Sequence, residues 1–240
     1  MTRKPSLQSS LFRNLALGPV LIGVALLIAS QFVTGKLLKR FAAEITGRTI
    51  AETQSDFLEY LRPVQEVVDL TRSLGEDGRF DPDQPEQLDP LMTAVLETVH
   101  QIDSVHVAKA DGTSYMMLRG ADGSYSGRLF SPATEGTVIN RVWPSAPHRG
   151  RRPMTRSVES DYDSRTRSWF RDALAHFESA PDLANARIPV WSEPYEFYTT
   201  GEPGITCSVA YRTPGGDTQI LAFDILLSDV VEFARESQSD

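Results

Sequence analysis

The chain has 240 residues, of which 40% are hydrophobic and 23% charged, a composition typical of a folded protein with a substantial core. Its formal net charge of -8 argues against nucleic acid as the main partner, because a nucleic-acid binder needs a basic surface. The single cysteine, Cys207, excludes an intramolecular disulfide and a cysteine-based metal site, and its apolar surroundings predict a buried strand residue.

Residues 15–35 predict a transmembrane helix. From Leu15 to Val33 no residue is charged, and about 20 apolar residues suffice to cross a hydrocarbon core of ~30 Å. A cleaved signal peptide is the alternative, although its apolar region is normally about 7–15 residues long and ends at a small-x-small cleavage site. Basic residues flank both ends of the span, so the short tail, residues 1–14, is what favours a cytoplasmic N-terminus with the long remainder translocated.

Residues 36–74 predict one long helix that continues from the membrane as a stalk. Apolar residues recur near the i, i+4 and i+7 positions of one face, with acidic residues between them. Pro63 should kink this helix or mark a join. The apolar face consists of Phe57, Leu61, Val64, Val68 and Leu74.

Residues 75–226 predict a folded domain, and residues 227–240 a connecting helix. A polar break after the stalk is followed by a helical period from Leu88 to Val99, and then the period changes to two. Asp111-Gly112 is a strong hairpin signal between two such strands. The expected later elements are strands at 137–143, 205–212 and 219–225, and helices at 166–177 and 230–235. The pattern predicts an α+β domain with a five- to six-stranded antiparallel sheet.

The segment from Asp161 to Leu174 concentrates arginines, large aromatic residues and carboxylates just before and within a predicted helix. One interpretation is the floor of a small-molecule site. The alternative is that its aromatic residues belong to the core, while Arg165 and Arg167 pair with nearby carboxylates at the surface. Residue types alone do not separate these two interpretations.

The order of these elements, together with three short motifs, resembles the double Cache family of bacterial extracytoplasmic sensor domains. The motifs are Tyr162-Asp-Ser-Arg-Thr-Arg167-Ser-Trp169-Phe170, Trp191-Ser-Glu-Pro-Tyr195 and Phe223-Asp224-Ile225. The resemblance implies PAS-like modules on one long helix, a single-pass protein of the bacterial inner membrane with a periplasmic sensor domain, and a homodimer formed through that helix.

The resemblance also implies a ligand site in the membrane-distal module. Its amino-acid-binding branch has a Tyr, an Arg five residues on and a Trp two further, which match Tyr162, Arg167 and Trp169. Tyr195 and Asp224 match its later positions. Arg167 is expected to hold a ligand carboxylate, for which a planar guanidinium is well suited.

Two departures from the family pattern change the expectation. Phe197 stands where the amino-acid binders carry an Asp that receives the ligand ammonium. An amino acid, an amine held by Asp224 alone and a small carboxylate therefore remain open as ligands. The second departure is length, since the sequence ends after what resembles the membrane-distal module and contains no cyclase, kinase, diguanylate cyclase or chemoreceptor output domain. We expect the input portion of a receptor that was truncated, is encoded as a fragment or pairs with a partner.

Other functions remain to be weighed against a sensor module. Catalysis by Asp161, Asp163 and Glu193 is conceivable, but no Ser-His-Asp order or phosphate-binding glycine loop accompanies them, so we expect no enzyme and no cofactor. The four histidines lack the i, i+4 spacing of a helical zinc site, and we expect no metal. The remaining alternative is an anchored periplasmic interaction or structural protein without a small-molecule ligand.

Overall fold

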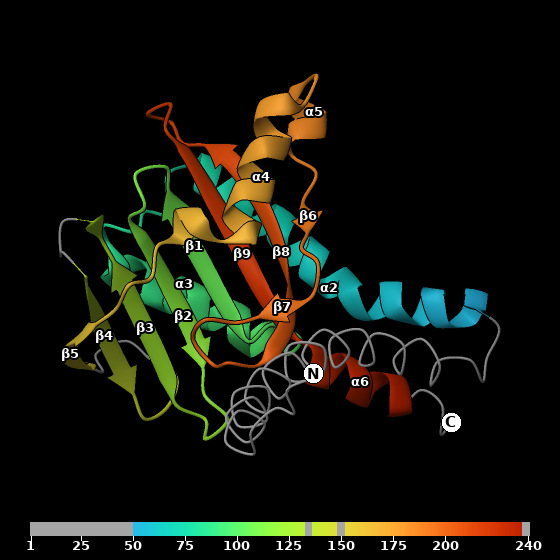
Figure 1. The fold of residues 1–240 in the computed structure, drawn as a ribbon, viewed down its shortest axis with the longest axis horizontal. Helices are drawn as coiled ribbons and strands as arrows, with labels where there is room; N and C mark the ends of the chain where they lie inside the picture. The colour runs from blue at the N-terminus through green and yellow to red at the C-terminus, as the bar shows by residue number, and fades with distance from the viewer. Residues whose placement is uncertain (1–49, 133–135, 148–151, 237–240) are drawn as a thin grey trace, which may run out of the picture. The chain divides into compact units, whose positions relative to one another are not determined.

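The computed structural model describes residues 50–132, 136–147 and 152–236, and the described residues from 55 onward form one compact unit (Figure 1). The predicted tail, 1–14, the membrane helix, 15–35, and the first part of the stalk lie outside the described residues. Within the part that is described, no helix is both long enough and apolar enough to cross a membrane.

A helix covers the described part of the predicted stalk, 36–74. Helix α2 (Ile50–Glu76) runs through Pro63 without a break, so this proline does not mark a join. Leu61, Val64 and Val68 are buried against the domain, as expected from their spacing. The helix ends two residues later than predicted, because Gly78 with a φ of 77° follows it and favours a left-handed turn there.

Helix α3 (Pro85–Thr98) begins three residues before the predicted period. Pro85 accounts for the earlier start, since proline lacks an N–H and has a backbone angle suited to the first helical turn. Leu88, Met92 and Leu96 are fully buried on one side of the helix. Both α2 and α3 thus present one apolar face to the same core.

The described strands form one sheet, and every strand pairing in it is antiparallel. Its order is β5-β4-β3-β2-β1-β9-β8-β6, with β7 also paired to β8 (Figure 1). The α+β class with an antiparallel sheet is confirmed, but the described residues contain nine strands, not five or six. The strands are β1 (Ser104–Lys109), β2 (Ser114–Arg119), β3 (Tyr125–Phe130), β4 (Thr137–Trp143), β5 (Met154–Glu159), β6 (Val190–Trp191), β7 (Tyr195–Glu196), β8 (Pro203–Arg212) and β9 (Thr218–Leu226).

The three additional strands, β5, β6 and β7, lack a periodic sequence pattern. All six residues of β5 are exposed, so the strand has no alternation of buried and exposed residues from which it could be predicted. Strands β6 and β7 have two residues each, too few for any period. These three strands pair only at the two ends of the sheet, with β4 and β8.

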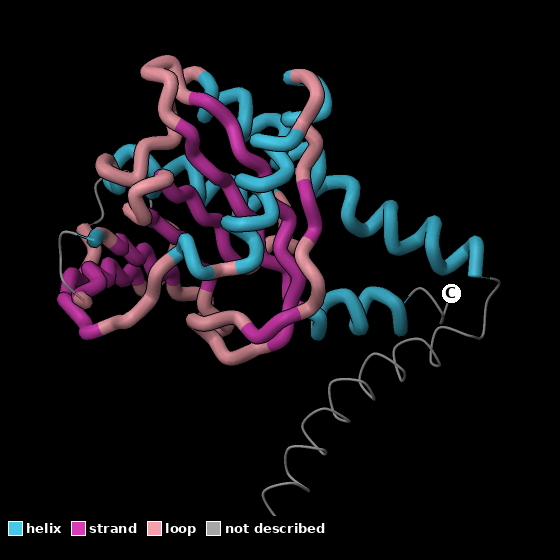
Figure 2. The backbone as a smooth tube through the Cα atoms, turned by 45° about the horizontal axis from the view of Figure 1, so that its top comes forward, coloured by secondary structure: helices cyan, strands magenta, loops and turns pink. Residues whose placement is uncertain are grey.

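The sheet has two differently covered faces (Figure 2). The main core lies between the sheet and the helices α2 and α3, and it includes Cys207, which is fully buried as predicted. Burial raises the pKa of the Cys207 thiol to about 12, so the thiol is protonated and unreactive at neutral pH. On the opposite face, alanines of β1, β8 and β9 leave room for another helix: Ala108, Ala210 and Ala222.

That other helix belongs to the segment that the sequence singled out. The short 3-10 helix η2 (Ser164–Thr166) precedes α4 (Ser168–Ser179), and between them Arg167 has an extended backbone. The predicted single helix from 166 to 177 is therefore interrupted at Arg167. Trp169, Phe170 and Ala173 of α4 pack on the alanine-lined face of the sheet.

A short helix that the sequence did not predict, α5 (Leu183–Ala186), follows α4 and leads to a contact with α2. Arg187 donates two hydrogen bonds to the Glu76 carboxylate, at 3.0 and 2.8 Å. Arg72, one turn before Glu76 on α2, donates to the same carboxylate at 2.8 Å. This bidentate ion pair joins the end of the α4–α5 segment to the end of α2.

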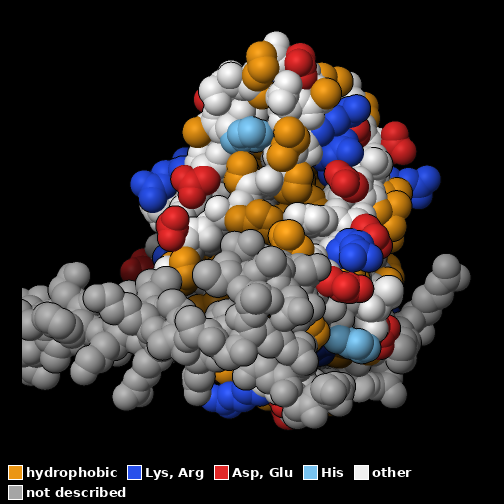
Figure 3. Space-filling model, turned by 90° about the vertical axis from the view of Figure 1, so that its right-hand side faces the viewer, with side chains coloured by type: hydrophobic (Ala, Val, Ile, Leu, Met, Phe, Trp, Pro, Cys, Tyr) orange, Lys and Arg blue, Asp and Glu red, His pale blue; other side chains and the backbone are white. Residues whose placement is uncertain are grey.

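The surface carries charged groups of both signs. On the side of the molecule in Figure 3, hydrophobic side chains lie among acidic and basic ones. Helix α2 contributes to the exposed apolar surface, since Leu58 and Leu70 are 63% and 60% exposed. These two residues lie off the buried stripe of the helix, and solvent is not excluded from them by any described residue.

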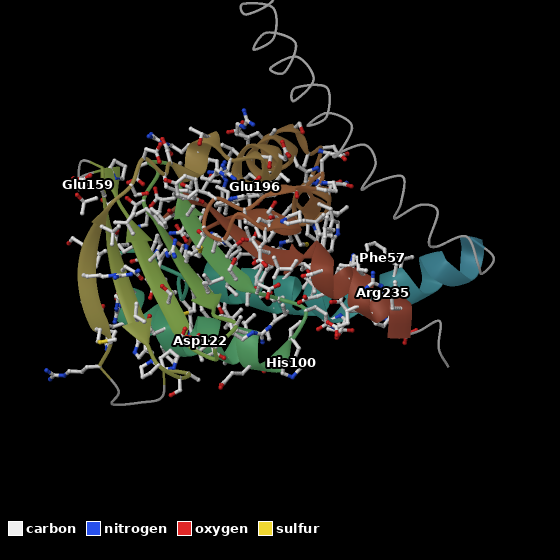
Figure 4. The ribbon with its side chains drawn as sticks, turned by 60° about the horizontal axis from the view of Figure 1, so that its bottom comes forward. Phe57, His100, Asp122, Glu159, Glu196 and Arg235 are labelled. Carbon is white, nitrogen blue, oxygen red and sulfur yellow. The ribbon has the colours of Figure 1, made fainter. Side chains whose placement is uncertain are left out.

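The last helix, α6 (Leu227–Glu236), falls within the predicted connecting segment, 227–240. It packs beside α2, with the rings of Tyr60 and Phe233 at 4.5 Å between centroids. Figure 4 shows the neighbouring arrangement through Phe57 on α2 and Arg235 on α6. Tyr60 and Phe233 thus bring α2 and α6 into contact.

A buried polar network lies between α3 and the sheet. The Asp89 carboxylate accepts a hydrogen bond from the Tyr115 hydroxyl at 2.5 Å and pairs with Arg141 at 2.8 Å. The Asp89 and Arg141 side chains are each 9% exposed. Burial raises the Asp89 pKa, whereas the Tyr115 hydrogen bond and the Arg141 charge oppose that rise.

Replacing Asp89 with Ala should lower the free energy of unfolding by about 3–5 kcal/mol, because buried Arg141 would keep only the exposed carboxylate of Glu86 as a partner and the buried Tyr115 hydroxyl would lose its acceptor. The double variant Asp89→Leu/Arg141→Met should recover most of that loss. Lys109→Ala is the control, since its pairs with Asp81 and Asp83 are partly exposed and contribute about 0–1 kcal/mol. Urea denaturation measures all three; an equal loss in Asp89→Ala and Lys109→Ala would contradict the expectation.

Candidate functional site

A cavity of about 320 Å³ opens on the face of the sheet that carries α4. Its walls come from β1 and β9, from the segment that joins η2 to α4, from β7 and the loop that follows it, and from the start of α6. All five ligand-binding residues predicted from the sequence line this cavity: Tyr162, Arg167, Trp169, Tyr195 and Asp224.

Arg167 supplies a cation that the described part of the protein leaves without an acidic partner. One of its N–H groups donates to the backbone oxygen of Glu196 at 3.3 Å, and its guanidinium lies over the rings of Tyr195 and Tyr198. No carboxylate within the described residues pairs with it, in contrast to Arg165, which holds Asp163 at 2.7 Å. The surface ion pair that was the alternative for Arg167 is therefore not found in this part of the chain.

The backbone around Arg167 also favours an anion. Arg167 is the residue that immediately precedes α4, and its side chain does not cap the helix. The first N–H groups of a helix and its dipole attract negative charge. A carboxylate bound by the Arg167 guanidinium would lie near this positive helix end.

Asp224 is a buried acid of the site, and side chains of the protein itself form hydrogen bonds to its carboxylate. Its Oδ1 accepts a hydrogen bond from the Thr206 hydroxyl at 2.6 Å, and its Oδ2 accepts from the Ser104 hydroxyl at 2.7 Å. His106 Nε2 lies 2.8 Å from the same Oδ2. Burial alone would raise the Asp224 pKa, but the charge of His106 and these hydrogen bonds hold it below its usual value.

The proton positions in this network follow from the number of donors. An ionised carboxylate only accepts, so His106 Nε2 must carry the proton that it shares with Asp224. The Thr206 hydroxyl has one proton, which it gives to Asp224. The Tyr195 hydroxyl, 2.7 Å from Thr206, must therefore donate to it, and this leaves the Tyr195 oxygen as an acceptor.

Aromatic rings form the rest of the wall. Tyr162 lies between Phe130 and Tyr198, at 4.3 and 5.1 Å between ring centroids. It also packs against a small hydrophobic cluster formed by Met116, Phe130 and Val138. Burial, and then the charge of Asp224, raise the Tyr162 pKa, so its hydroxyl stays protonated. Trp169 is 2% exposed and packs against His106, at 5.5 Å between ring centroids.

Phe197, at the position of the expected acidic residue, is also part of the wall. It is 6% exposed and packs edge-on against Tyr195. Gly204 makes this position possible, since a Cβ at residue 204 would lie 2.0 Å from the Phe197 ring. An apolar ring is thus packed where the amino-acid-binding branch would have a carboxylate.

Sequence reasoning missed the partners of Asp224. Thr206 could have been found, because the hairpin loop between β8 and β9 sets the register that places Thr206 directly opposite Asp224. Ser104 lies opposite Asp224 on the other side, from β1, and His106 lies two residues along on the same face. No sequence signal relates β1 to β9, which are more than a hundred residues apart, so Ser104 and His106 could not be assigned.

Further polar residues line the cavity without having been predicted. Asp103 accepts a hydrogen bond from the Leu226 backbone N–H at 3.1 Å, and Arg119 lies 4.0 Å from it. Arg119 donates to backbone oxygens at and just beyond the end of α3, at residues 96, 100 and 102. Burial, followed by the charge of Asp229, raises the Asp103 pKa to about 6 even though the Leu226 hydrogen bond lowers it.

The carboxylates considered for catalysis do not meet at this cavity. Asp163 pairs with Arg165, Asp161 accepts a hydrogen bond from the Tyr198 hydroxyl, and Glu193 is exposed. None of the three is among the described residues that line the cavity. A search of the described residues for metal-binding groups of three or more His, Cys, Asp or Glu also finds none.

The chain has partial similarity to a curated protein and to several solved structures. No protein-family model matches the chain. Over 85 residues, 35% of its length, the chain is 33% identical to adenylate cyclase 1 of Rhizobium meliloti (strain 1021), and this segment is 11% of that protein.

Solved structures similar to the chain are ligand-binding domains of chemoreceptors. One is from Campylobacter jejuni Tlp3, in complex with 4-methylisoleucine, with 14% identity, a TM-score of 0.48, and coverage of 76% of this chain and 56% of that one. Another is from the Pseudomonas aeruginosa PAO1 amino acid chemoreceptor PctC, in complex with GABA, with 20% identity, a TM-score of 0.42, and coverage of 82% and 67%.

The stability of the protein should fall as pH rises from about 4 to about 6, relative to the variant Asp103→Asn. Asp103 has a pKa near 6 when folded and 3.8 otherwise, so within this window the folded state binds more protons than the unfolded state. Two pKa units correspond to on the order of 3 kcal/mol. Urea denaturation of both proteins at pH 4 and pH 7 measures the difference, and parallel behaviour of the two proteins would contradict the raised pKa.

Proposed function

We propose that the chain is the membrane-anchored, extracytoplasmic ligand-sensing module of a bacterial signal-transduction receptor of the double Cache type, and that it binds a small carboxylate. The observation that supports this proposal most strongly is Arg167, whose guanidinium lines the cavity without a carboxylate partner among the described residues. A planar guanidinium without an internal partner is suited to bind a carboxylate with two parallel hydrogen bonds.

The other arginines nearby are engaged. Arg119 donates to backbone oxygens at the end of α3, Arg165 holds Asp163, and Arg187 holds Glu76. Arg167 has five N–H donors, and one long hydrogen bond to the Glu196 backbone uses a single donor. A ligand carboxylate would supply the acceptors that the described residues do not.

The size and the walls of the cavity indicate the rest of the ligand. A cavity of about 320 Å³ is at the lower end of the volumes of ligand pockets, roughly 300–1,000 Å³. Tyr162, Trp169 and Phe197 offer ring surface to an apolar part of the ligand. We therefore propose a small organic acid, with Arg167 as the carboxylate-binding residue and with these rings as its apolar contacts.

The remaining parts of the proposal concern the whole receptor. Residues 15–35 would anchor the module in the inner membrane, and the helix that includes α2 would form a homodimer and transmit the signal. Exposed Leu58 and Leu70 on α2 support a protein contact along this helix. The same exposure supports the alternative function, an anchored interaction protein without a ligand, which the following experiment distinguishes.

A thermal shift screen of the purified 240-residue chain in mild detergent, against small carboxylates, amino acids and amines, tests the proposal. A bound carboxylate should raise the Tm by mass action. In Arg167→Ala the affinity for that compound should fall roughly 10- to 100-fold, because a charge-assisted hydrogen-bond pair is lost. Arg167→Lys should lose part of the affinity, since an ammonium keeps the charge without the two parallel donors.

Arg171→Ala is the matched control. Arg171 lies on α4, one turn after Arg167, but it is exposed and does not line the cavity. Its replacement should leave the affinity unchanged. A Tm that responds to no carboxylate would favour the interaction protein, and a shift that persists in Arg167→Ala would rule out Arg167 as the carboxylate-binding residue.

A further inference from the structure

We propose that Arg128, Asn140 and Arg156 form a second anion site, outside the cavity, and that this site binds a tetrahedral oxyanion such as phosphate or sulfate. The three residues belong to the adjacent strands β3, β4 and β5. The strand register places Arg128 directly opposite Asn140, and Asn140 directly opposite Arg156. The site is independent of the proposed function, because none of the three residues is among the described residues that line the cavity.

The three side chains lie on the face of the sheet that also carries the cavity. Residues directly opposite each other in an antiparallel sheet point to the same side. The same row continues from Arg128 to Met116 on β2 and from Met116 to His106 on β1, and His106 lines the cavity. Helix α4 packs on β1, β8 and β9, whereas β3, β4 and β5 lie at the other end of the sheet (Figure 1). The row therefore leads from the cavity to a part of this face that lies beyond α4.

Two cations lie close together in this row without an acidic partner. In the part of the chain that the structure describes, no carboxylate pairs with Arg128 or Arg156, in contrast to Arg141 on the other face, which pairs with Asp89. The Nε atom of Arg128 is buried and has no hydrogen-bond partner there. Burial, and then the charge of Arg156, lower the Arg128 pKa, so the two guanidinium groups are near enough to repel each other. An anion between them would remove this repulsion and supply the missing acceptor.

Asn140 adds a neutral donor between the two cations. It is 7% exposed, and its Oδ1 accepts a hydrogen bond from the Ser126 hydroxyl at 2.7 Å. This bond assigns the oxygen of the amide to Ser126 and leaves the two N–H donors of Nδ2 for another acceptor. A carboxylate at position 140 would pair with both arginines from within the protein. The amide has no charge, so the charges of both arginines remain for a ligand.

Tyr198 relates the proposed site to the cavity. The Arg167 guanidinium lies 6.0 Å from the centre of the Tyr198 ring, and the Tyr198 hydroxyl donates a hydrogen bond to Asp161. Tyr198 also acts on the Arg128 pKa, which places these two side chains near each other. Tyr198 lines the cavity and Arg128 does not. The cations Arg128 and Arg167 are therefore neighbours of one ring but belong to different surfaces, and the experiment must separate them.

The arrangement of donors favours a tetrahedral oxyanion over a carboxylate. Neighbouring strands are about 4.8 Å apart, so three residues on three strands approach an anion from three directions. A carboxylate has two oxygens in one plane, for which a single guanidinium suffices. A phosphate group has at least three acceptor oxygens and a charge of about -1.5 to -2 at pH 7, which matches two arginines. A free oxyanion and the terminal group of a phosphomonoester share this chemistry.

The test is isothermal titration calorimetry of the 240-residue chain in mild detergent, at constant ionic strength. The titrants are inorganic phosphate, sulfate, methyl phosphate and acetate. Phosphate and sulfate should bind at this site at least about tenfold more tightly than acetate, because they accept from all three residues. Methyl phosphate that binds as tightly as inorganic phosphate assigns the site to phosphomonoesters, and methyl phosphate that is excluded assigns it to the free ion; both results support the proposal.

Asn140→Asp is the decisive variant, because it keeps the shape of the side chain and places a carboxylate between the two arginines. It should lower the affinity for phosphate roughly 10- to 100-fold, since the internal carboxylate takes the donors and repels the anion. Arg128→Gln should lower the affinity to a similar degree. Arg156→Gln should lower it by about 3- to 10-fold, because Arg156 is exposed and its charge is screened by solvent. Arg156→Gln also provides the readout if the substitution of partly buried Arg128 prevents folding.

Arg171→Gln is the control for net charge, since it removes the same charge from an exposed position on α4 and should leave the affinity for phosphate unchanged. Arg167→Ala should also leave it unchanged. Phosphate binding that Arg167→Ala abolishes would place the anion in the cavity and overturn the proposal.

Phosphate binding that persists in both Asn140→Asp and Arg156→Gln would overturn the proposal as well, and so would a wild-type chain that binds neither phosphate nor sulfate. These results leave the carboxylate-binding function of Arg167 standing, because that function has its own ligands and its own variant. Conversely, a chain that binds no carboxylate in the thermal shift screen can still bind phosphate at Arg128, Asn140 and Arg156.

Discussion

The Asp224 carboxylate is the interaction on which the arrangement of the site depends. It lies near the end of the central strand β9, with β1 on one side and β8 on the other, and both neighbours contribute a hydroxyl directly opposite to it. A buried carboxylate must have its acceptors satisfied, and here three donors from two flanking strands satisfy them. The same network reaches Tyr195 through Thr206, so the central acid also fixes one wall of the cavity.

Two of the charged residues that line the cavity differ in how their charge is compensated. Asp224 is neutralised from within and serves to position the strands and Tyr195, whereas Arg167 faces the cavity with its charge uncompensated by the described residues. Charges act strongly in a site that is partly closed to water.

Much of this arrangement could be predicted from the sequence, and the rest depends on strand pairing. Tyr162, Arg167 and Trp169 line one cavity, and they could be grouped from the sequence because all three lie on one short segment, where local sequence determines position. Thr206 was accessible through the register of the β8–β9 hairpin. The contact of His106 with Asp224 could not be predicted, since it exists only because β1 pairs with β9. Strand β5 could not be predicted either, since its fully exposed residues carry no periodic signal.

The ion pair between Glu76 and Arg187 has a consequence for how the site and the stalk depend on each other. The segment from Arg167 to Arg187 contacts the cavity at its beginning and α2 at its end, and this second contact bypasses the sheet. If a ligand holds Arg167 in a position that strengthens this pair, thermodynamic reciprocity requires that an intact pair strengthen the binding of the ligand to the same degree. The affinity of the cavity for such a ligand would then contain a contribution from the state of α2.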